Sequence, residues 1–351
     1  MVQFLIKRIL YGFLVLLGAV VVVFFIFNVL PGDPVNMMAG QRTDVATREA
    51  ISKELGLDLP IRKQLFHYIN DLSVLSIHQN TSKNQKKYRY STLLTVGNNV
   101  VVWKTPYLRR SFQSNKLVSE IIVENVEGTF WLALSAMAFA TIVGICLGIF
   151  ASLRQNSLLD HSIITFSVIG ISMPSFVFGA LMAMIFFFFF SDYTGLNASG
   201  SLWENTIYGD RELKLKNLIL PTITLGLSPM TIIIQLTRSS MLEVLSQDYI
   251  RTARAKGLGS YSIIFKHALK NALNPVITAV SGWLASLMAG AFFVESIFGW
   301  KGLGSVTINA VLSLDFPVVM GATIFVALVF IITNIFVDIF YAMIDPRVRL
   351  K

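Results

Sequence analysis

The side chains best placed to do chemistry are cations on one short polar stretch of the sequence. Arg251, Arg254 and Lys256 lie within DYIRTARAKGLGSYSIIFKHALKNALNP, residues 248–275, between two long apolar segments. Enzymatic catalysis needs a nucleophile with a base or a carboxylate pair. No such constellation stands out at the mouth of any apolar segment. The sequence therefore predicts a binding surface and no active site.

The same stretch is predicted to fold as a helix, a glycine break and a second helix. Tyr249, Ile250, Ala253 and Gly257 recur at helical spacing, so they share one face of the first helix. Glycine at position 257 ends that helix, and the second helix covers residues 261–273. A small, shallow face of this kind fits a groove on a partner. An ordinary loop whose positive charge only sets the topology is the alternative.

Composition places the chain among integral membrane proteins. Of its 351 residues 54% are hydrophobic and only 14% are charged, far from the balance of a soluble domain. The net charge is +9, but the basic residues are scattered between apolar segments, which argues against a nucleic-acid partner. The single cysteine, Cys146, and four isolated histidines predict neither a disulfide framework nor a metal site.

Six segments are apolar and long enough to cross a bilayer as helices. The predicted organisation is a cytoplasmic end and first span at 1–30, an external domain at 31–127, spans at 128–153, 161–191, 217–243, 275–294 and 316–344, a cytoplasmic loop at 244–275, and a cytoplasmic tail at 345–351. Within the external domain we expect a short amphipathic helix over 47–55 and two strands within 88–104, with a turn near Asn98 and Asn99.

The distribution of lysine and arginine supports this orientation. Twelve such residues lie in the predicted cytoplasmic segments, counted as 1–8, 154–160, 238–270 and 345–351, and four lie in the short external loops. Loops longer than about sixty residues do not follow the positive-inside rule, so the cations of the long external domain are not counted. The basic stretch at 248–275 is therefore predicted to face the cytoplasm.

Several strings resemble one transporter family. RTARAKG followed by HALKNALNP resembles the EAA loop of ABC importer permeases, and RSSMLEVLSQDYIRTARAKGL is similar to the permease subunits of dipeptide and oligopeptide importers. PGDP after the first span, ISMPSF in the third span, ESIFGWKGLG and the terminal DPRVRLK also resemble that family. The chain departs from it at Arg251, which replaces the glutamate that names the loop, and within residues 72–116, an insertion without a counterpart.

The resemblance implies an all-α integral membrane protein with the six-helix type I ABC importer permease fold and a large external insertion after the first helix. It implies that the coupling helix, which contacts a cytoplasmic ATPase, contains Asp248, Tyr249, Arg251, Ala253, Arg254, Ala255, Lys256 and Gly257. An external gate hairpin would contain Glu295, Phe298, Gly299, Trp300 and Gly302. Because a proline inside a span must be buried or line a cavity, Ser172, Pro174 and Ser175 are expected near the translocation path, with simple helix packing as the alternative.

The same resemblance implies the partners. The sequence has no Walker A glycine loop, so ATP and Mg²⁺ are expected on two cytoplasmic ATPase subunits, and this chain is expected to bind no cofactor. A second homologous permease would complete the pore, an external binding protein would deliver di- or oligopeptides, and lipid would surround the spans. The expected location is a bacterial-type inner membrane, with both termini in the cytoplasm.

Three alternatives stay open at this point. The solute of an ABC permease could be another small molecule, such as a nickel chelate. An ion-coupled secondary transporter needs ionisable residues deep in the bilayer, yet Glu295 and Asp338 lie near span ends. A structural subunit without transport activity is the third alternative.

Overall fold

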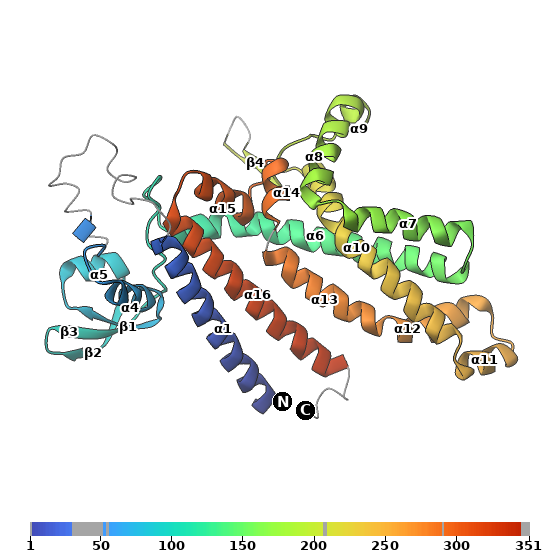
Figure 1. Cartoon of the computed structure of the whole chain (residues 1–351), viewed down its shortest axis with the longest axis horizontal. Coiled ribbons are helices and arrows are strands. Elements are labelled where there is room, and N and C mark those ends of the chain that lie inside the picture. The colour runs from blue at the N-terminus through green and yellow to red at the C-terminus, as the bar shows by residue number, and fades with distance from the viewer. Residues whose placement is uncertain (1, 30–51, 54–55, 206–208, 290, 345–351) are drawn as a thin grey trace. The chain divides into compact units, whose positions relative to one another are not determined.

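The computed structural model describes residues 2–29, 52–53, 56–205, 209–289 and 291–344 (Figure 1). Most of the helix predicted over 47–55, and the predicted tail at 345–351, lie outside these residues. The chain divides into two compact units. One unit contains the described residues of Asn125–Val306 and those from Val329 onward, and the other contains those of Val2–Glu124 and Thr307–Leu328.

Within the described residues, five helical segments are long and apolar enough to cross a membrane. They are Ile6–Phe27 of α1 (Val2–Val29), α6 (Val118–Leu153), Ser175–Thr194, α10 (Lys216–Leu245) and Phe316–Ile339 of α16 (Phe316–Ile344). Many of their apolar side chains are exposed, as Phe188 is at 72%, because lipid takes the place of a protein core around them. The predicted all-α membrane fold is confirmed.

The third predicted span, 161–191, differs from the expectation of a single kinked helix. It consists of α7 (Leu158–Ser172), α8 (Ser175–Ile185), the π-helix η1 (Phe186–Phe190) and α9 (Ser191–Thr194). Met173 is extended, with ψ 129°, and Pro174 follows it. A residue before proline is pushed out of the helical region, so the chain breaks there completely.

Two other predicted spans also have different bounds in the structure. The helix expected over 128–153 already begins at Val118, and the span expected over 275–294 contains α13 (Asn274–Ala289), which has 16 residues. The remaining elements of this region are β4 (Trp203–Asn205), β5 (Arg211–Leu213), α11 (Asp248–Ala255), the π-helix η2 (Ser262–Ala268), α12 (Leu269–Ala272), α14 (Phe292–Ile297) and α15 (Leu303–Leu312).

Small residues on α6 bring α10 close to it. A Cβ atom on Gly144 would lie 2.7 Å from Ile233 Cγ2, and one on Gly148 would lie 2.5 Å from Thr237 Cβ. Such contacts exclude any larger side chain and are typical of helix pairs within membranes. Figure 1 shows α6, α7 and α10 running beside one another. Of these helices, α6 and α10 hold much of the buried core of their unit, including Leu132 of α6 and Leu220 of α10.

The other unit contains a small mixed subdomain after α1. It consists of α4 (Ile61–Leu72), β1 (Leu75–Gln79), α5 (Ser82–Tyr88), β2 (Ser91–Val96) and β3 (Asn99–Trp103), with an antiparallel sheet in the order β1-β3-β2 (Figure 1). The two predicted strands are confirmed as β2 and β3, joined at Gly97 and Asn98. β1 was not predicted, because its short sequence, LSIHQ, mixes apolar and polar residues.

Candidate functional site

The helix α11 is ended by its glycine. Gly257 has φ +76°, which a residue with a side chain seldom adopts. Its N–H donates to the carbonyl of Arg254 at 3.0 Å, and the N–H of Leu258 donates to that of Ala253 at 3.3 Å. This pair of bonds is a Schellman motif, which satisfies the last carbonyls of a helix. The acidic Asp248 in the first turn and the basic Arg254 in the last turn both interact favourably with the helix dipole.

One face of α11 is buried against its own chain. Ile250 is fully buried and Ala253 is 7% exposed. They pack with buried residues of α10, η2 and α12, namely Met241, Ile263, Ala268 and Ala272. The face that the sequence suggested for a partner's groove is therefore used, at these two residues, to attach α11 to the membrane helices.

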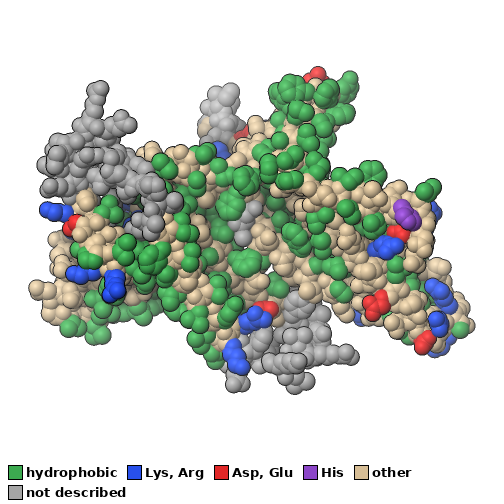
Figure 2. All heavy atoms as spheres, in the orientation of Figure 1, with side chains coloured by type: hydrophobic (Ala, Val, Ile, Leu, Met, Phe, Trp, Pro, Cys, Tyr) green, Lys and Arg blue, Asp and Glu red, His purple; other side chains and the backbone are tan. Residues whose placement is uncertain are grey.

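The opposite face of α11 is exposed and charged. The side chains of Asp248 and Arg251 are 95% and 74% exposed, and Arg254, Ala255 and Lys256 are exposed as well. Figure 2 shows Lys and Arg side chains gathered at the end of the molecule where α11 lies. The hydroxyl of Tyr249 accepts a hydrogen bond from Asn271 Nδ2 at 2.9 Å. A partner would therefore contact the exposed charged side chains of α11 and not the buried Ile250 and Ala253.

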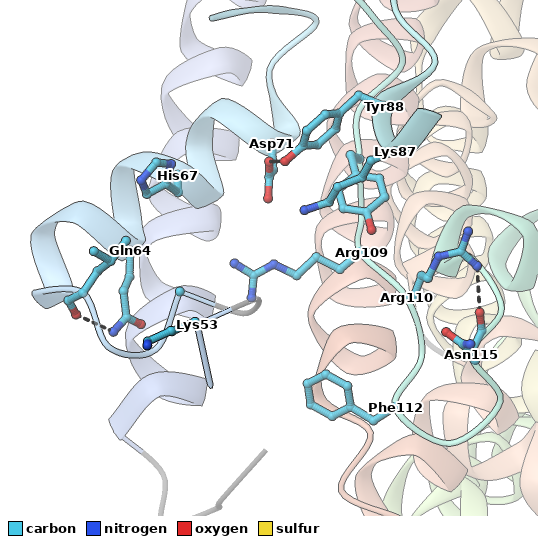
Figure 3. A pocket seen from close by; sticks show the side chains of 13 residues that line it. Lys53, Gln64, His67, Asp71, Lys87, Tyr88, Arg109, Arg110, Phe112 and Asn115 are labelled. Atoms are coloured by element: carbon cyan, nitrogen blue, oxygen red, sulfur yellow. Dashed lines mark hydrogen bonds between the residues drawn. The ribbon is translucent and has the colours of Figure 1, made fainter. Parts of the chain in front are cut away.

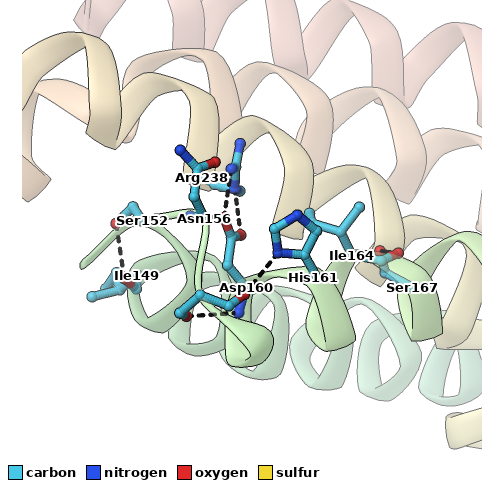
Figure 4. A network of polar contacts seen from close by, with 9 residues as sticks. Ile149, Ser152, Asn156, Asp160, His161, Ile164, Ser167 and Arg238 are labelled. Atoms are coloured by element: carbon cyan, nitrogen blue, oxygen red, sulfur yellow. Dashed lines mark hydrogen bonds and ion pairs between the residues drawn. The ribbon is translucent and has the colours of Figure 1, made fainter. Parts of the chain in front are cut away.

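An ion pair joins α10 to the first turn of α7 (Figure 4). Arg238 donates through Nε and Nη2 to the two carboxylate oxygens of Asp160, each at 2.7 Å. The Asp160 side chain is 3% exposed, and its Oδ2 also accepts from the N–H of Asn156 at 2.9 Å. Ser157 caps the same helix, because its hydroxyl accepts from the N–H of Asp160. A bidentate pair of this kind fixes both distance and direction.

Two further contacts hold α7 against α10. The hydroxyl of Thr231 donates to the carbonyl of Ser167 at 2.7 Å. A Cβ atom on Gly170 would lie 2.8 Å from Leu227 Cγ, so the helices touch there without room for a side chain. With the ion pair, these contacts fix α7 to α10 at three levels. A displacement of α10 would therefore carry α7 with it.

The predicted gate hairpin is organised around a buried carboxylate. Glu295 is fully buried, and its oxygens accept from the hydroxyl of Thr129 at 2.7 Å and from the N–H of Ser305 at 2.9 Å. Thr129 in turn accepts from the N–H of Leu303 at 2.8 Å. A Cβ atom on Gly302 would overlap the Glu295 carboxylate, so only glycine fits there. The Glu295 side chain therefore ties the hairpin to α6.

The remaining hairpin residues complete this packing. Trp300 is 1% exposed, and its indole N–H donates to the carbonyl of Gly128 at 2.9 Å. Phe298 is equally buried, and its carbonyl accepts from the N–H of Gly200 at 2.9 Å. Gly299 has φ +58°, which allows the chain to turn between the two aromatic residues. The five residues predicted for the hairpin thus lie together in one compact turn.

The residues predicted near a translocation path lie at the break between α7 and α8. Ser172 is exposed and its hydroxyl donates to the carbonyl of Val168 at 2.9 Å, while Pro174 is exposed and precedes α8. Ser175 is half-buried. An apolar cavity of about 500 Å³ beside α6, α7, α8 and α10 is lined by Met173, but not by these three residues. The structure therefore places these three residues at the break between the two helices and not in this cavity.

Sequence reasoning missed three residues that organise these sites. Asp160 was assigned only to a loop, Arg238 only to the end of the span predicted over 217–243, and Thr129 had no role. A signal for Asp160 was present, because Ser157-Leu-Leu-Asp160 before an apolar run has the spacing of a capped helix start. No signal in the sequence pairs Thr129 with Glu295, since the two are far apart in the chain.

Two family models match the chain. Residues 144–350 match "Binding-protein-dependent transport system inner membrane component", and residues 1–133 match "Binding-prot-dependent transport system membrane comp, N-term". The two matches together leave only a short segment uncovered.

Curated relatives match over the full length. The "Dipeptide transport system permease protein DppB" of Escherichia coli (strain K12) is 35% identical over 369 residues, covering 100% of both chains. The "Glutathione transport system permease protein GsiC" of Pectobacterium atrosepticum is 33% identical, again covering 100% of both. The "Di/tripeptide transport system permease protein DppB" of Pseudomonas aeruginosa is 33% identical and covers 95% of this chain and 94% of its own.

A solved structure of the MetNI methionine ABC transporter, in an inward-facing conformation, is similar to part of the chain. It covers 62% of this chain and 95% of its own, with 17% identity and a TM-score of 0.44.

Proposed function

Since this chain belongs to the family of binding-protein-dependent transport system inner membrane components, we propose that it forms half of the membrane pathway of a peptide importer. As a member, it is a multi-pass permease subunit of an inner-membrane ABC importer and not an enzyme. The proposal concerns the cargo, the partners, the orientation and the residues that couple ATP hydrolysis to transport. The observation that carries it is the full-length likeness to permeases named for dipeptide and di/tripeptide transport.

The coupling surface is the charged face of α11, made of Asp248, Arg251, Arg254 and Lys256 with Ala255 between them. These side chains are exposed, whereas Ile250 and Ala253 attach the helix to α10, η2 and α12. A partner that pushes on α11 therefore moves a helix that is already packed against the membrane-spanning part of the chain. Tyr249 and Gly257 act on this surface indirectly, by fixing the position and the end of the helix.

Movement then passes from α11 to α7. Met241 of α10 packs with Ile250, and the Asp160–Arg238 pair connects α10 to α7. Packed helices transmit displacement as rigid bodies when their contacts hold both direction and distance. We infer that α7 and α10 tilt together when the ATPases close, and that the break at Ser172, Pro174 and Ser175 lets α8 follow a different path beside the cargo.

The Glu295 hairpin is the external gate of the same pathway. Its turn consists of Phe298, Gly299, Trp300 and Gly302. The hydrogen bonds from Thr129 to Glu295 and from Trp300 to Gly128 make this turn move with α6. Two cytoplasmic ATPase subunits carry the ATP and Mg²⁺, a second homologous permease supplies the other half of the pore, and an external binding protein delivers the peptide. Both termini face the cytoplasm, as the distribution of lysine and arginine favours.

The test is transport by the reconstituted complex. The chain is purified with the subunits that accompany it and placed in proteoliposomes, with ATP on the side of the membrane that holds the ATPase subunits. Labelled dipeptide and tripeptide are then added on the other side with the copurified binding protein. Uptake that requires ATP and is competed by unlabelled peptides supports the proposal. Uptake by this chain alone along an ion gradient would contradict it and favour the secondary-transporter alternative.

Glutathione is a second candidate cargo, because a relative that is 33% identical over its whole length is named for glutathione transport. Competition in the same assay separates the candidates. Glutathione that displaces labelled dipeptide at lower concentration than any linear peptide would favour it. Nickel chelates form a third arm, in which nickel uptake without peptide uptake would favour that cargo.

A further inference from the structure

A cationic cavity opens in the subdomain that follows α1. Its volume is about 380 Å³, and it is lined by α4, α5 and the segment 107–115 (Figure 3). Among the described residues that line it, four side chains are cationic and one is anionic. The cations are Lys53, Lys87, Arg109 and Arg110, and the carboxylate is that of Asp71.

The single carboxylate is already engaged within the protein. Asp71 is 8% exposed, and its Oδ1 accepts from the hydroxyl of Tyr88 at 2.9 Å. The backbone carbonyl of Asp71 accepts from the ammonium group of Lys104, which is also buried. This cluster adds a further positive charge behind the wall of the cavity. The described residues therefore leave the cavity with an excess of positive charge.

Arg109 is the cation best placed to bind a ligand. Its backbone is left-handed, with φ 66°, and its guanidinium lies over the ring of Tyr68, 5.1 Å from the centroid. Figure 3 shows the side chain reaching across the cavity toward the wall that carries Lys53 and His67. In the described part of the chain no carboxylate forms an ion pair with it. A guanidinium held by an aromatic ring presents its N–H edge, the geometry that recognises phosphate with two parallel hydrogen bonds.

The cavity lies at the end of a membrane-spanning segment. The ring of Tyr68 packs against the ring of Phe24, with centroids 5.6 Å apart, and Phe24 is in the last turn of the apolar segment Ile6–Phe27. Lipid phosphates are found at this depth, just beyond the hydrocarbon core. Tyrosine at this level is typical of the membrane interface, and basic pockets beside spans bind anionic headgroups.

The neighbouring sheet has an apolar surface that suits the same environment. One of its faces carries five exposed apolar residues and the half-buried Val101, beside the polar Gln79, Asn99 and Ser91. The exposed apolar residues are Leu75, Ile77, Trp103, Leu94 and Val96. Trp103 is 56% exposed and Val96 is 69% exposed. Exposed apolar patches of this kind mark contact with a membrane or a protein. Because α4 connects this sheet to the end of α1, a lipid surface is the nearest apolar phase.

We propose that this cavity binds the phosphate of an anionic lipid headgroup, with Arg109 as the bidentate donor and Lys53 and Lys87 beside it. The sheet face Leu75–Trp103–Val96 rests on the lipid beside it. The inference is independent of the cargo and requires only that α1 spans the membrane.

The experiment measures binding of short-chain phosphatidylglycerol to the full chain in detergent with its copurified subunits, by calorimetry. Inorganic phosphate and short-chain phosphatidylcholine are titrated in parallel. We expect phosphatidylglycerol to bind at least about tenfold more tightly than either, and Arg109→Gln to weaken it by about tenfold, because a charge-assisted bidentate bond is lost. Arg109→Lys keeps the charge but loses the paired N–H donors, so its affinity for phosphatidylglycerol should lie between those of the unaltered chain and Arg109→Gln.

A matched pair of lysine variants controls for net charge. Lys87→Gln removes a cation that lines the cavity, whereas Lys86→Gln removes an exposed neighbour on the same helix that does not line it. The first should weaken lipid binding severalfold and the second should leave it unchanged. Unfolding temperatures equal to that of the unaltered chain show that each variant folds.

Two results would overturn the proposal. Equal affinity for inorganic phosphate and phosphatidylglycerol would reject the lipid as the ligand. Unaltered lipid binding by folded Arg109→Gln would reject the cavity as the site, as would equal losses in Lys86→Gln and Lys87→Gln. Loss of binding-protein docking in Arg109→Gln with lipid binding intact would assign the cations to a protein partner.

Discussion

The Asp160 carboxylate and the Arg238 guanidinium meet edge to edge, 2.7 Å apart at both oxygens, with Asp160 nearly excluded from solvent. Removing one partner of a pair like this leaves the other charge without its hydrogen bonds, at a site where Asp160 is 3% and Arg238 is 25% exposed. The exposed pair Asp248–Arg251, 3.3 Å apart on α11, has water as an alternative partner. The two pairs therefore offer a direct comparison within one unit.

Asp160→Asn or Arg238→Gln should each lower the free energy of unfolding by about 2–3 kcal/mol, the cost of losing hydrogen bonds to a charged group. In the double variant the two losses should not add, because the contact is shared. Thermal unfolding in detergent and ATP-driven uptake are measured together. The corresponding cycle on Asp248 and Arg251 should give a coupling below about 0.5 kcal/mol. Additive losses at Asp160 and Arg238 would refute a direct interaction.

His78 makes the small subdomain sensitive to acid. Burial, with the nearby Lys104 cation adding to it, lowers the pKa of His78 to about 4, and its ring stacks on Tyr88 with centroids 4.1 Å apart. Above pH 6.5 the imidazole is neutral in both the folded and the unfolded chain. As the pH falls from 6.5 toward 4, the unfolded chain binds the proton first, so the folded subdomain loses stability.

The expected result is faster hydrogen exchange in β1, β2 and β3 at pH 5 than at pH 7, after correction for the intrinsic pH dependence of exchange. The loss is at most about 1.4 kcal/mol for each pH unit within that window. His78→Gln should abolish the difference, whereas His67→Gln should keep it. A pH difference that survives His78→Gln would mean that another group is responsible.

At the scale of elements, α11 depends on how it ends. A Cβ atom on Gly257 would meet nothing within 4 Å, so the requirement for glycine comes from φ +76° alone. Gly259 also has open space around it but no positive φ. The two glycines look alike in the sequence, yet the structure separates them by backbone conformation.

Gly257→Val should destabilise the end of α11 by about 1–2 kcal/mol, because β-branched residues resist the left-handed conformation. Gly257→Asn should be milder, since asparagine tolerates it. Under the proposed coupling, Gly257→Val should reduce both copurification of the ATPases and peptide uptake. Gly259→Ala serves as the matched control and should change neither. Full uptake by Gly257→Val would count against α11 as the coupling element.

Element prediction succeeded where a single physical signal was strong. Long uncharged runs identified α1, α10 and α16 well, because lipid demands continuous apolar helices. It was less accurate where two rules compete. In residues 161–191 the apolar run favoured one span, while Pro174 broke it. The gate hairpin stays a prediction from resemblance, and its organisation around Glu295 depends on Thr129 from another helix, which no local pattern reveals.

At the scale of the whole molecule, the Asp160–Arg238 pair also constrains topology. It joins the loop around residues 154–160 to the end of α10, so both must lie on one side of the membrane. The charge distribution also predicts that the two segments share a side, and it predicts that this side is the cytoplasm. Cysteine labelling tests which side of the membrane they face.

The chain's single cysteine makes this measurement simple. In a Cys146→Ala background, Arg154→Cys should be protected from a membrane-impermeant maleimide added outside cells, and Lys214→Cys should be labelled. Both lie on exposed segments, so burial does not limit the reaction. Permeabilised cells, in which both variants should react, provide the control. Labelling of Arg154→Cys in intact cells would invert the proposed orientation.

The π-helix η2, Ser262–Ala268, follows α11 after the turn at Gly257. A π-helical segment holds more residues per turn than an α-helix, and each residue of an α-helix advances the chain by about 100°. Because α12 continues from η2 without a break, the angular phase of α12 relative to the start of η2 is set by this locally expanded winding. Deleting one residue here, such as the exposed Phe265, would let the segment rewind as an α-helix while the helices on either side largely keep their relative phase, because a wide π-helical turn accommodates one more residue than an α-helical turn. A single-residue deletion should accordingly be tolerated better in this interval than inside the regular α-helix α13, where it would rotate everything downstream by about 100°.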